Sequence, residues 1–320
     1  MPLDVDIYIG KRIPIRESFM VDKRKQSFTF SVPGEPVLVN VDPGKSMLWE
    51  KNVDQSATAY QFQYYNAKNY RDKYEALNFF EDNLEKGDAV FRSSLDDSFW
   101  NVRRKGLRSL NPTLIDKGLW QKIARLAESD SDVRVRTEAL EKLLESDDPS
   151  FSSIGEKAIT QEKTYQDIAG GMKIVAAYSP DKLSQYTDKF KSSDNLSLIM
   201  AVAGAFGQLG DVKNLKYFED KLPSVNGFDV FPFFEPYTEL ALAIKDDSQR
   251  QGLADKMKGL AMDSGVGQWK RFSATRLIVA LRDGMKAEGN TAQSDKYAQY
   301  FEEIKKAETN GQLKGIYGRF

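Results

Sequence analysis

The chain has 320 residues, and its 46 basic and 47 acidic residues give a net charge of -1, so charge alone does not indicate nucleic acid or an anionic membrane as a partner. It contains no cysteine and no histidine, which excludes disulfides, thiol catalysis, metal sites built on these residues and a Ser-His-Asp triad. No apolar run approaches the roughly 20 residues that span a bilayer, and no signal peptide is recognisable, so the compartment stays open.

Residues 3–48 have the pattern of an antiparallel sheet. Apolar residues alternate over 3–9, 13–21, 28–32 and 37–41, with turn sequences between these runs. Four such runs predict a meander of short strands with one apolar face, which another layer must cover. Because the chain begins within this pattern, we expect strands to be missing upstream. We therefore predict a partial β-sandwich domain over residues 1–52.

From about Ser56 onward the apolar residues follow a helical period, which predicts an all-helical domain over 53–320. The connections between the helices are short, as antiparallel helix pairs require. The predicted helices cover residues 56–67, 69–85, 88–95, 98–109, 113–128, 132–145, 150–160, 162–178, 180–191, 194–208, 211–221, 234–245, 248–263, 268–286 and 291–309. Residues 310–320 contain Gly and Asn breakers and are predicted to be an irregular tail.

One amphipathic segment recurs along the helical region. The segments 72–77, 102–107 and 135–140 align on a small residue, which is Ala76, Gly106 and Ala139 in turn, at steps of 30 and 33 residues. Met172 and Ala203 continue the series more weakly. One such helix per period predicts stacked helix pairs, the α-α superhelix of a HEAT-like solenoid. The predicted fold class is thus mainly α, with a small antiparallel β-sandwich portion in front.

The passage from strands to helices resembles a known family. The runs 25–30 (KQSFTF) and 36–43 (PVLVNVDP), followed by Leu48, resemble the end of the small β-sandwich domain of M1-family zinc aminopeptidases. The run 64–77 (YYNAKNYRDKYEAL) looks like the first helical hairpin of that family's C-terminal domain. The resemblance is most specific over residues 25–145 and concerns only the architecture beyond them. It implies that the helical domain forms a bowl over a zinc site and limits entry to short peptide ends.

The chain departs from this family in its chemistry. The M1 catalytic domain carries an H-E-x-x-H motif and a G-x-M-E-N motif, whereas this chain has no histidine and its run 170–173 (GGMK) does not match the second motif. We therefore expect no catalytic, cofactor-binding or metal-binding residue here, with zinc confined to the catalytic domain of a longer parent. The expected partners are that domain and a peptide substrate. Alternatives are a free-standing HEAT-like adaptor that binds a protein, or a β-sandwich module that binds glycan or peptide.

Residues 227–237 (GFDVFPFFEPY) are the most unusual stretch of the chain. Two prolines and five aromatic residues argue against a regular helix throughout. One interpretation is a binding loop on a concave surface, and the other is an aromatic plug that fills a corner of the solenoid. We favour the plug, because loops this apolar usually bury themselves. The aromatic interaction candidates are Phe228, Phe231, Phe233, Phe234 and Tyr237.

A basic cluster lies beside two aromatic residues. It consists of Arg103, Arg104, Lys105 and Arg108 next to Phe99 and Trp100. It can be a site for phosphate or for a peptide carboxylate, with Arg103 and Arg104 as the candidates. We favour the solvated face of a repeat helix, with Asp96 and Asp97 expected to neutralise the cluster.

Overall fold

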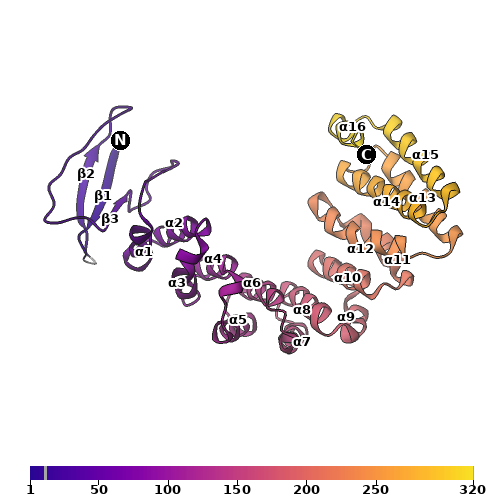
Figure 1. The fold of residues 1–320 in the computed structure, drawn as a ribbon, viewed down its shortest axis with the longest axis horizontal. Coiled ribbons are helices and arrows are strands. Elements are labelled where there is room, and N and C mark those ends of the chain that lie inside the picture. Colours follow the sequence, from indigo (N-terminus) through magenta and orange to yellow (C-terminus); the bar gives the residue numbers. More distant parts are fainter. Residues whose placement is uncertain (11–12, 320) are drawn as a thin grey trace. The chain divides into compact units, whose positions relative to one another are not determined.

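The structure is a computed structural model that describes residues 1–10 and 13–319. It is mainly helical, with a small three-strand antiparallel sheet at the N-terminus (Figure 1). The chain divides into two compact units, residues 1–147 and 148–320, which are described in turn. The domain boundary predicted near residue 52 falls inside the first unit. In the described part of the chain, no helix is long and apolar enough to cross a membrane.

The sheet consists of β1 (Pro2–Tyr8), β2 (Ile15–Met20) and β3 (Leu38–Val41), in the order β2-β1-β3. Both neighbours run antiparallel to β1. The predicted four-strand meander is therefore wrong in two respects, since β3 pairs with β1 and residues 28–32 form no strand. The central strand β1 has both of its edges occupied, by β2 and β3, and the 28–32 run pairs with none of these strands.

The run 28–32 instead packs through its side chains. Phe19 pairs with Leu3 in the register of β1 and β2, which puts both on one face of the sheet. The rings of Phe28 and Phe30 lie 4.4 and 5.8 Å from the ring of Phe19. The alternating pattern thus marks a segment with one apolar side. That side packs on the ring of Phe19, and the backbone of the segment does not pair with a neighbouring strand.

The opposite face of the sheet meets the first helices, α1 (Ala57–Asn66) and α2 (Tyr70–Glu81). Tyr8 and Leu38 form a buried cluster with Ala59 and with Phe62, whose ring lies 5.5 Å from that of Tyr8. Because alternate residues of a strand share a face, Asn40 also points toward these helices. This interface therefore mixes apolar packing with a buried polar position.

The other helices of the first unit are α3 (Leu84–Ser94), α4 (Trp100–Ser109), α5 (Lys117–Ser129) and α6 (Val133–Leu143). They pack as the pairs α1/α2, α3/α4 and α5/α6, and α4 contacts both α2 and α6 (Figure 1). The aligned residues Ala76, Gly106 and Ala139 are buried on α2, α4 and α6. A Cβ on Gly106 would overlap Oγ of Ser94 on α3, so this small residue permits the close approach of two helices.

The second unit begins with α7 (Ser152–Gln161), α8 (Tyr165–Tyr178), α9 (Leu183–Phe190), α10 (Leu196–Leu209) and α11 (Leu215–Lys221). It continues with α12 (Val230–Leu242), α13 (Asp247–Met262), α14 (Gln268–Ala287) and α15 (Thr291–Ala307). The helices pack as α7/α8, α9/α10, α11/α12 and α13/α14, and α8, α10, α12 and α14 contact one another in series. Met172 on α8 and Ala203 on α10 are buried. One continuous core runs through this unit.

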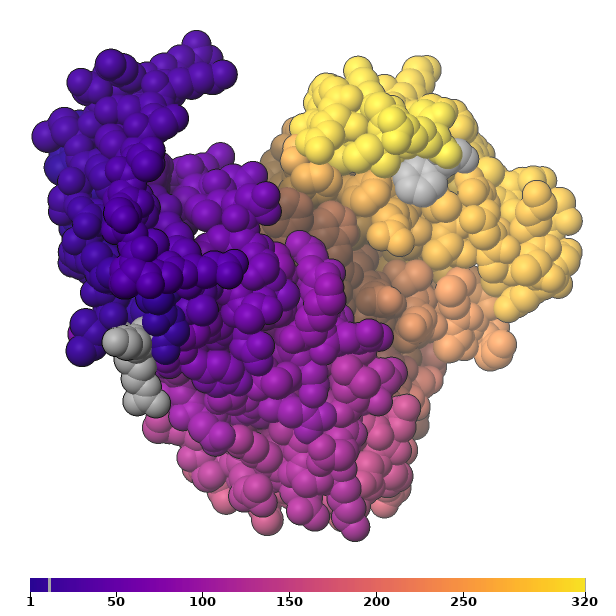
Figure 2. All heavy atoms as spheres, turned by 60° about the vertical axis from the view of Figure 1, so that its left-hand side comes forward, coloured from indigo at the N-terminus to yellow at the C-terminus, as the bar shows by residue number. Residues whose placement is uncertain are grey.

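The predicted irregular tail is wrong for residues 311–317, which form a last helix, α16 (Gly311–Tyr317). Asn310 starts it, because its side chain accepts hydrogen bonds from the amides of Gln312 and Leu313. Leu313 and Tyr317 are fully buried, and the yellow C-terminal segment lies against the orange part of the same unit in the space-filling view (Figure 2). Burial of Leu313 and Tyr317, which lie one helical turn apart, stabilises the helix more than the Gly and Asn residues of this segment disfavour it.

Candidate functional site

The aromatic stretch 227–237 is not one regular helix throughout, as the sequence predicted, but α12 begins at Val230, whereas the predicted helix began at residue 234. A short 3-10 turn (Gly227–Asp229) leads directly into α12. Pro232 is the third residue of α12, where a backbone N–H has no partner within the helix, so its missing hydrogen costs little. Pro236 lies inside the helix and removes one bond, but it packs on α10 where Gly207 leaves room for its ring. Packing against α10 therefore stabilises a helix that its two prolines would disfavour in isolation.

Three of the five aromatic candidates belong to the core. Phe233, Phe234 and Tyr237 are 0%, 4% and 0% exposed. The rings of Phe233 and Tyr237 lie 5.2 and 4.9 Å from that of Phe218 on α11. Burial also raises the pKa of Tyr237 above its usual value of 10.0. For Phe233 and Tyr237 the packing role is sufficient.

The two other candidates reach the surface. Phe228 is 72% exposed, and Phe231 is half-buried. Their rings lie 6.2 Å apart, and each lies 5.6 Å from the ring of Trp269 at the start of α14. The stretch thus forms an aromatic shelf, Phe228, Phe231 and Trp269, where α12 and α14 begin.

A groove of about 520 Å³ continues from this shelf between α12 and α14. Its volume falls in the range of small-ligand sites. From α12 it is lined by Phe231, Pro232, Phe234, Glu235, Thr238, Glu239 and Leu242, and from α14 by Ser273, Arg276 and Ala280. It therefore combines apolar walls with charges of both signs. Sequence reasoning found its aromatic residues but missed the charged ones and Ser273, although Glu235 and Glu239 sit one helical turn apart directly beside the aromatic run.

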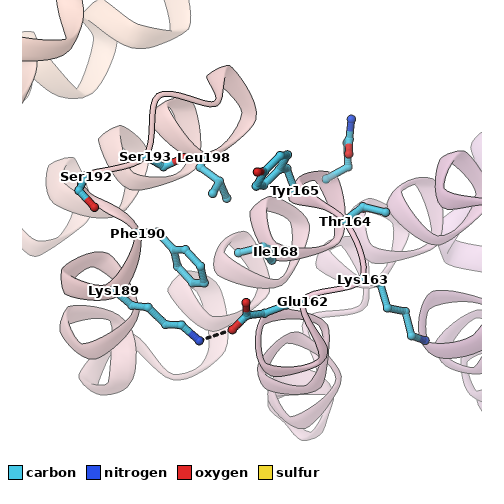
Figure 3. A pocket seen from close by; sticks show the side chains of 11 residues that line it. Glu162, Lys163, Thr164, Tyr165, Ile168, Lys189, Phe190, Ser192, Ser193 and Leu198 are labelled. Atoms are coloured by element: carbon cyan, nitrogen blue, oxygen red, sulfur yellow. Dashed lines mark hydrogen bonds and ion pairs between the residues drawn. The ribbon is translucent and has the colours of Figure 1, made fainter.

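A second pocket, of about 550 Å³, lies among the ends of α7 to α10 (Figure 3). Tyr165, Ile168, Phe190 and Leu198 line its apolar part. At its rim Nζ of Lys189 donates a hydrogen bond to the carboxylate of Glu162, drawn as a dashed line in Figure 3. Because that acid and that base already neutralise each other, this pocket offers a ligand less charge than the α12/α14 groove.

The basic cluster of α4 is neutralised, but by other acids than the sequence suggested. Nε and Nη2 of Arg103 donate to the two carboxylate oxygens of Asp130, both at 2.7 Å. Arg104 and Arg108 share Glu138 on α6, at 3.0 and 2.7 Å. The cluster thereby links α4 to the next helix pair.

The expected acids have partners elsewhere. Asp96 pairs with Lys122, and Asp97 pairs with Lys73 on α2. The prediction that these two acids neutralise the cluster is therefore wrong. It failed because sequence proximity along one loop does not show which carboxylates the neighbouring helix pair supplies.

Within residues 1–10 and 13–319, no group of three or more acidic side chains lies close enough to hold a metal ion. Comparison with protein-family models gives no match. Comparison with curated proteins gives no match either.

Proposed function

We propose that this chain is the non-catalytic C-terminal part of a protein that resembles the M1-family zinc aminopeptidases. Its sheet would be the end of a β-sandwich, and its helix pairs would form a HEAT-like solenoid. The zinc site and the hydrolysis of N-terminal peptide bonds would belong to an upstream domain. This part would support that domain and restrict access to the ends of short peptides.

The observation that carries the proposal is a buried junction between the two most specific runs of the resemblance. Nδ2 of Asn40, in the run 36–43, donates a 3.1 Å hydrogen bond to Oδ1 of Asp72, in the run 64–77. Nζ of Lys45 lies 2.6 Å from the same carboxylate oxygen. Asn40 and Asp72 are 2% and 1% exposed. The two runs thus build one interface, which supports the interpretation of their order as a shared architectural signature.

The Asp-Pro step of the first run has a clear structural role. Asp42 adopts a left-handed backbone with φ of 52°, where Asp is tolerated better than most residues. Its carboxylate accepts hydrogen bonds from the amides of Ser46 and Met47 at 3.0 and 3.1 Å. Burial alone would raise the pKa of Asp42, but these hydrogen bonds lower it overall. This turn ends β3 and directs the chain toward α1.

Two equivalent contacts support the solenoid. Lys73 lies three residues before Ala76 and pairs with Asp97, which lies nine residues before Gly106. Arg103 lies three residues before Gly106 and pairs with Asp130, which lies nine residues before Ala139. Nη1 of Arg103 donates to the carbonyl of Asp97 at 2.9 Å, and Nη1 of Arg136 donates to that of Asp130 at 2.8 Å. Recurrence of the same contacts at successive steps is what stacked repeats require.

The gating role is tested on the chain extended upstream through its own coding sequence. We expect this longer protein to release the N-terminal residue of short peptides much faster than the same residue at the start of a long unfolded polypeptide. Equal kcat/KM values for the short and long substrates would contradict the gate.

The second candidate, a free-standing adaptor, draws support from the exposed aromatic shelf. The exposed Phe228, with the half-buried Trp269 beside it, presents an apolar surface of the kind found at protein contacts. An adaptor predicts that the extended protein, if an upstream reading frame exists at all, neither holds zinc nor cleaves peptides.

A further inference from the structure

The groove between α12 and α14 holds three charged side chains that have no ion-pair partner in the described part of the chain. Glu235 and Glu239 on one wall and Arg276 on the other are exposed, and none of them forms an ion pair with any residue in the described ranges. Some other charges of this unit are paired, as Lys256 is with Glu219 at 2.8 Å and Arg271 with Glu308 at 2.9 Å. Both signs are therefore available in one small concave site.

The two glutamates also oppose each other. They lie four residues apart on α12, where like charges repel each other and destabilise a helix. A cation held between them would relieve this repulsion. Arg276 faces the same space from α14, and a guanidinium binds a carboxylate through two parallel hydrogen bonds.

A buried polar atom marks the base of the groove. Ser273 lines the groove, is 3% exposed, and its Oγ has no hydrogen-bond partner among the described residues. A helical serine usually bonds to a backbone carbonyl one turn earlier, as Thr275 does to Arg271 at 2.9 Å. Because a buried hydroxyl without a hydrogen-bond partner destabilises the folded chain, a polar group of a ligand at this position would be stabilised.

The remaining lining is apolar. Phe231 and Phe234 form one side and Ala280 lies on the other, with Leu242 at the far end. Leu242 lies at the close contact of the two helices, since a Cβ on Gly284 would come within 2.9 Å of its Cδ2. The groove thus narrows at that end and offers an apolar surface beside its charges.

We propose that this groove binds a small zwitterion that carries an ammonium group, a carboxylate and an apolar side chain, namely an amino acid or a short peptide. Glu235 and Glu239 bind the ammonium group, Arg276 binds the carboxylate, and Ser273 bonds to a polar atom between them. The side chain packs on Phe231 and Phe234. This site is distinct from the proposed role as gate and scaffold, and it needs no upstream domain.

The test is calorimetric titration of the whole 320-residue chain with four probes. These are the dipeptide leucylphenylalanine, its N-acetyl form, its C-terminal amide, and free leucine. We expect the dipeptide to bind with a Kd below about 1 mM, and both blocked forms to bind at least about tenfold more weakly. Free leucine separates the sources: affinity equal to that of the dipeptide indicates an amino-acid site, and weaker binding indicates a peptide site.

Variants assign the charges. Arg276→Gln should weaken the dipeptide about tenfold and leave the amide unchanged, so that the two ligands become equal. The double variant Glu235→Gln/Glu239→Gln should weaken binding of the dipeptide about tenfold and leave binding of the N-acetyl form unchanged, so that these two ligands become equal. Glu288→Gln and Arg24→Gln remove exposed charges outside the groove and should change nothing.

Circular dichroism checks that each variant folds, and the altered positions are all exposed. Absence of binding by every probe up to about 10 mM, where even weak small-ligand sites fill, would overturn the proposal. So would binding that Arg276→Gln leaves intact.

Discussion

Nζ of Lys45 lies 2.6 Å from Oδ1 of Asp72, at the point where the sheet meets the first helical hairpin. The side chains are 11% and 2% exposed, so the pair is shielded from solvent. Burial raises the pKa of Asp72, and Lys45 opposes that rise. The lysine therefore compensates a carboxylate that the fold has removed from water.

Lys45→Met should destabilise the first unit by about 3 kcal/mol at neutral pH, because it leaves Asp72 buried without its cation. Asp72 then takes up a proton more readily in the folded state than in the unfolded state. The penalty should shrink as the pH falls through the raised pKa of the folded-state Asp72, and it should be smallest below 3.8, the usual pKa of an Asp, where the carboxyl is protonated in both states. Urea unfolding at several pH values measures this. Lys216→Met removes an exposed, solvent-screened pair and should leave the stability essentially unchanged at any pH.

The ion pair between Arg103 and Asp130 should be a major link between successive helix pairs. Asp130→Asn leaves the 12% exposed guanidinium of Arg103 without a carboxylate, and we expect a loss of about 2–4 kcal/mol. Asp220→Asn on the surface of α11 is the matched control. Thermal unfolding followed by circular dichroism compares the two variants. Equal stabilities would show that Asp130 does not hold α4 to its neighbour.

Substitution of two glycines by alanine should change the stability of the folded chain in opposite directions. A Cβ at Gly106 would overlap Oγ of Ser94 and lie 3.1 Å from the carbonyl oxygen of Phe91, so Gly106→Ala must push α3 and α4 apart, at about 1–3 kcal/mol. Gly204 lies within α10 with nothing within 4 Å of such a Cβ. Gly204→Ala should stabilise the chain by about 0.5–1 kcal/mol. A stable Gly106→Ala variant would contradict the close helix contact.

These positions also show what the sequence alone could predict. The small residue at the 30- to 33-residue step is visible in the sequence, and so is the helix that carries it. What the sequence could not supply was the partner of Arg103, because Asp97 is nearer in the chain and Asp130 is nearer in space. The same holds for residues 28–32, whose alternation is real but is satisfied by the ring of Phe19 instead of a neighbouring strand.

The α12/α14 groove was only half visible for a related reason. Its aromatic residues lie together in one run of sequence, whereas Arg276 and Ser273 come from a helix some forty residues later. The run itself was predicted not to be a regular helix throughout, with a helix only from residue 234, because two prolines usually break one. It is helical because Pro232 occupies the first turn and Gly207 accommodates Pro236. Neither fact can be read from residues 227–237 alone.

Buried tyrosines should make the protein sensitive to alkali. Burial raises the pKa of Tyr217 and Tyr237 above 10.0, so above pH 10 the unfolded chain loses phenolic protons that the folded chain keeps. Stability is therefore full below pH 10 and should fall above it, by about 1.4 kcal/mol per pH unit for each such tyrosine. Urea unfolding between pH 9 and 11.5 measures the slope.

Tyr237→Phe should reduce this slope. The hydroxyl of Tyr237 has no hydrogen-bond partner among the described residues, so its removal should leave stability at pH 7 unchanged or raise it by about 1 kcal/mol. The phenyl ring keeps the stack on Phe218. A large loss at pH 7 would show that the hydroxyl is satisfied in solution.

The most direct test of the proposed function measures bound zinc and aminopeptidase activity in two proteins, the 320-residue chain and the same chain extended upstream through its coding sequence. We predict that only the extended protein holds zinc and releases N-terminal residues from peptides, and that the shorter chain does neither. Zinc-free extended protein without activity would contradict the proposed relation to the M1 family. Hydrolysis by the shorter chain would contradict its non-catalytic role.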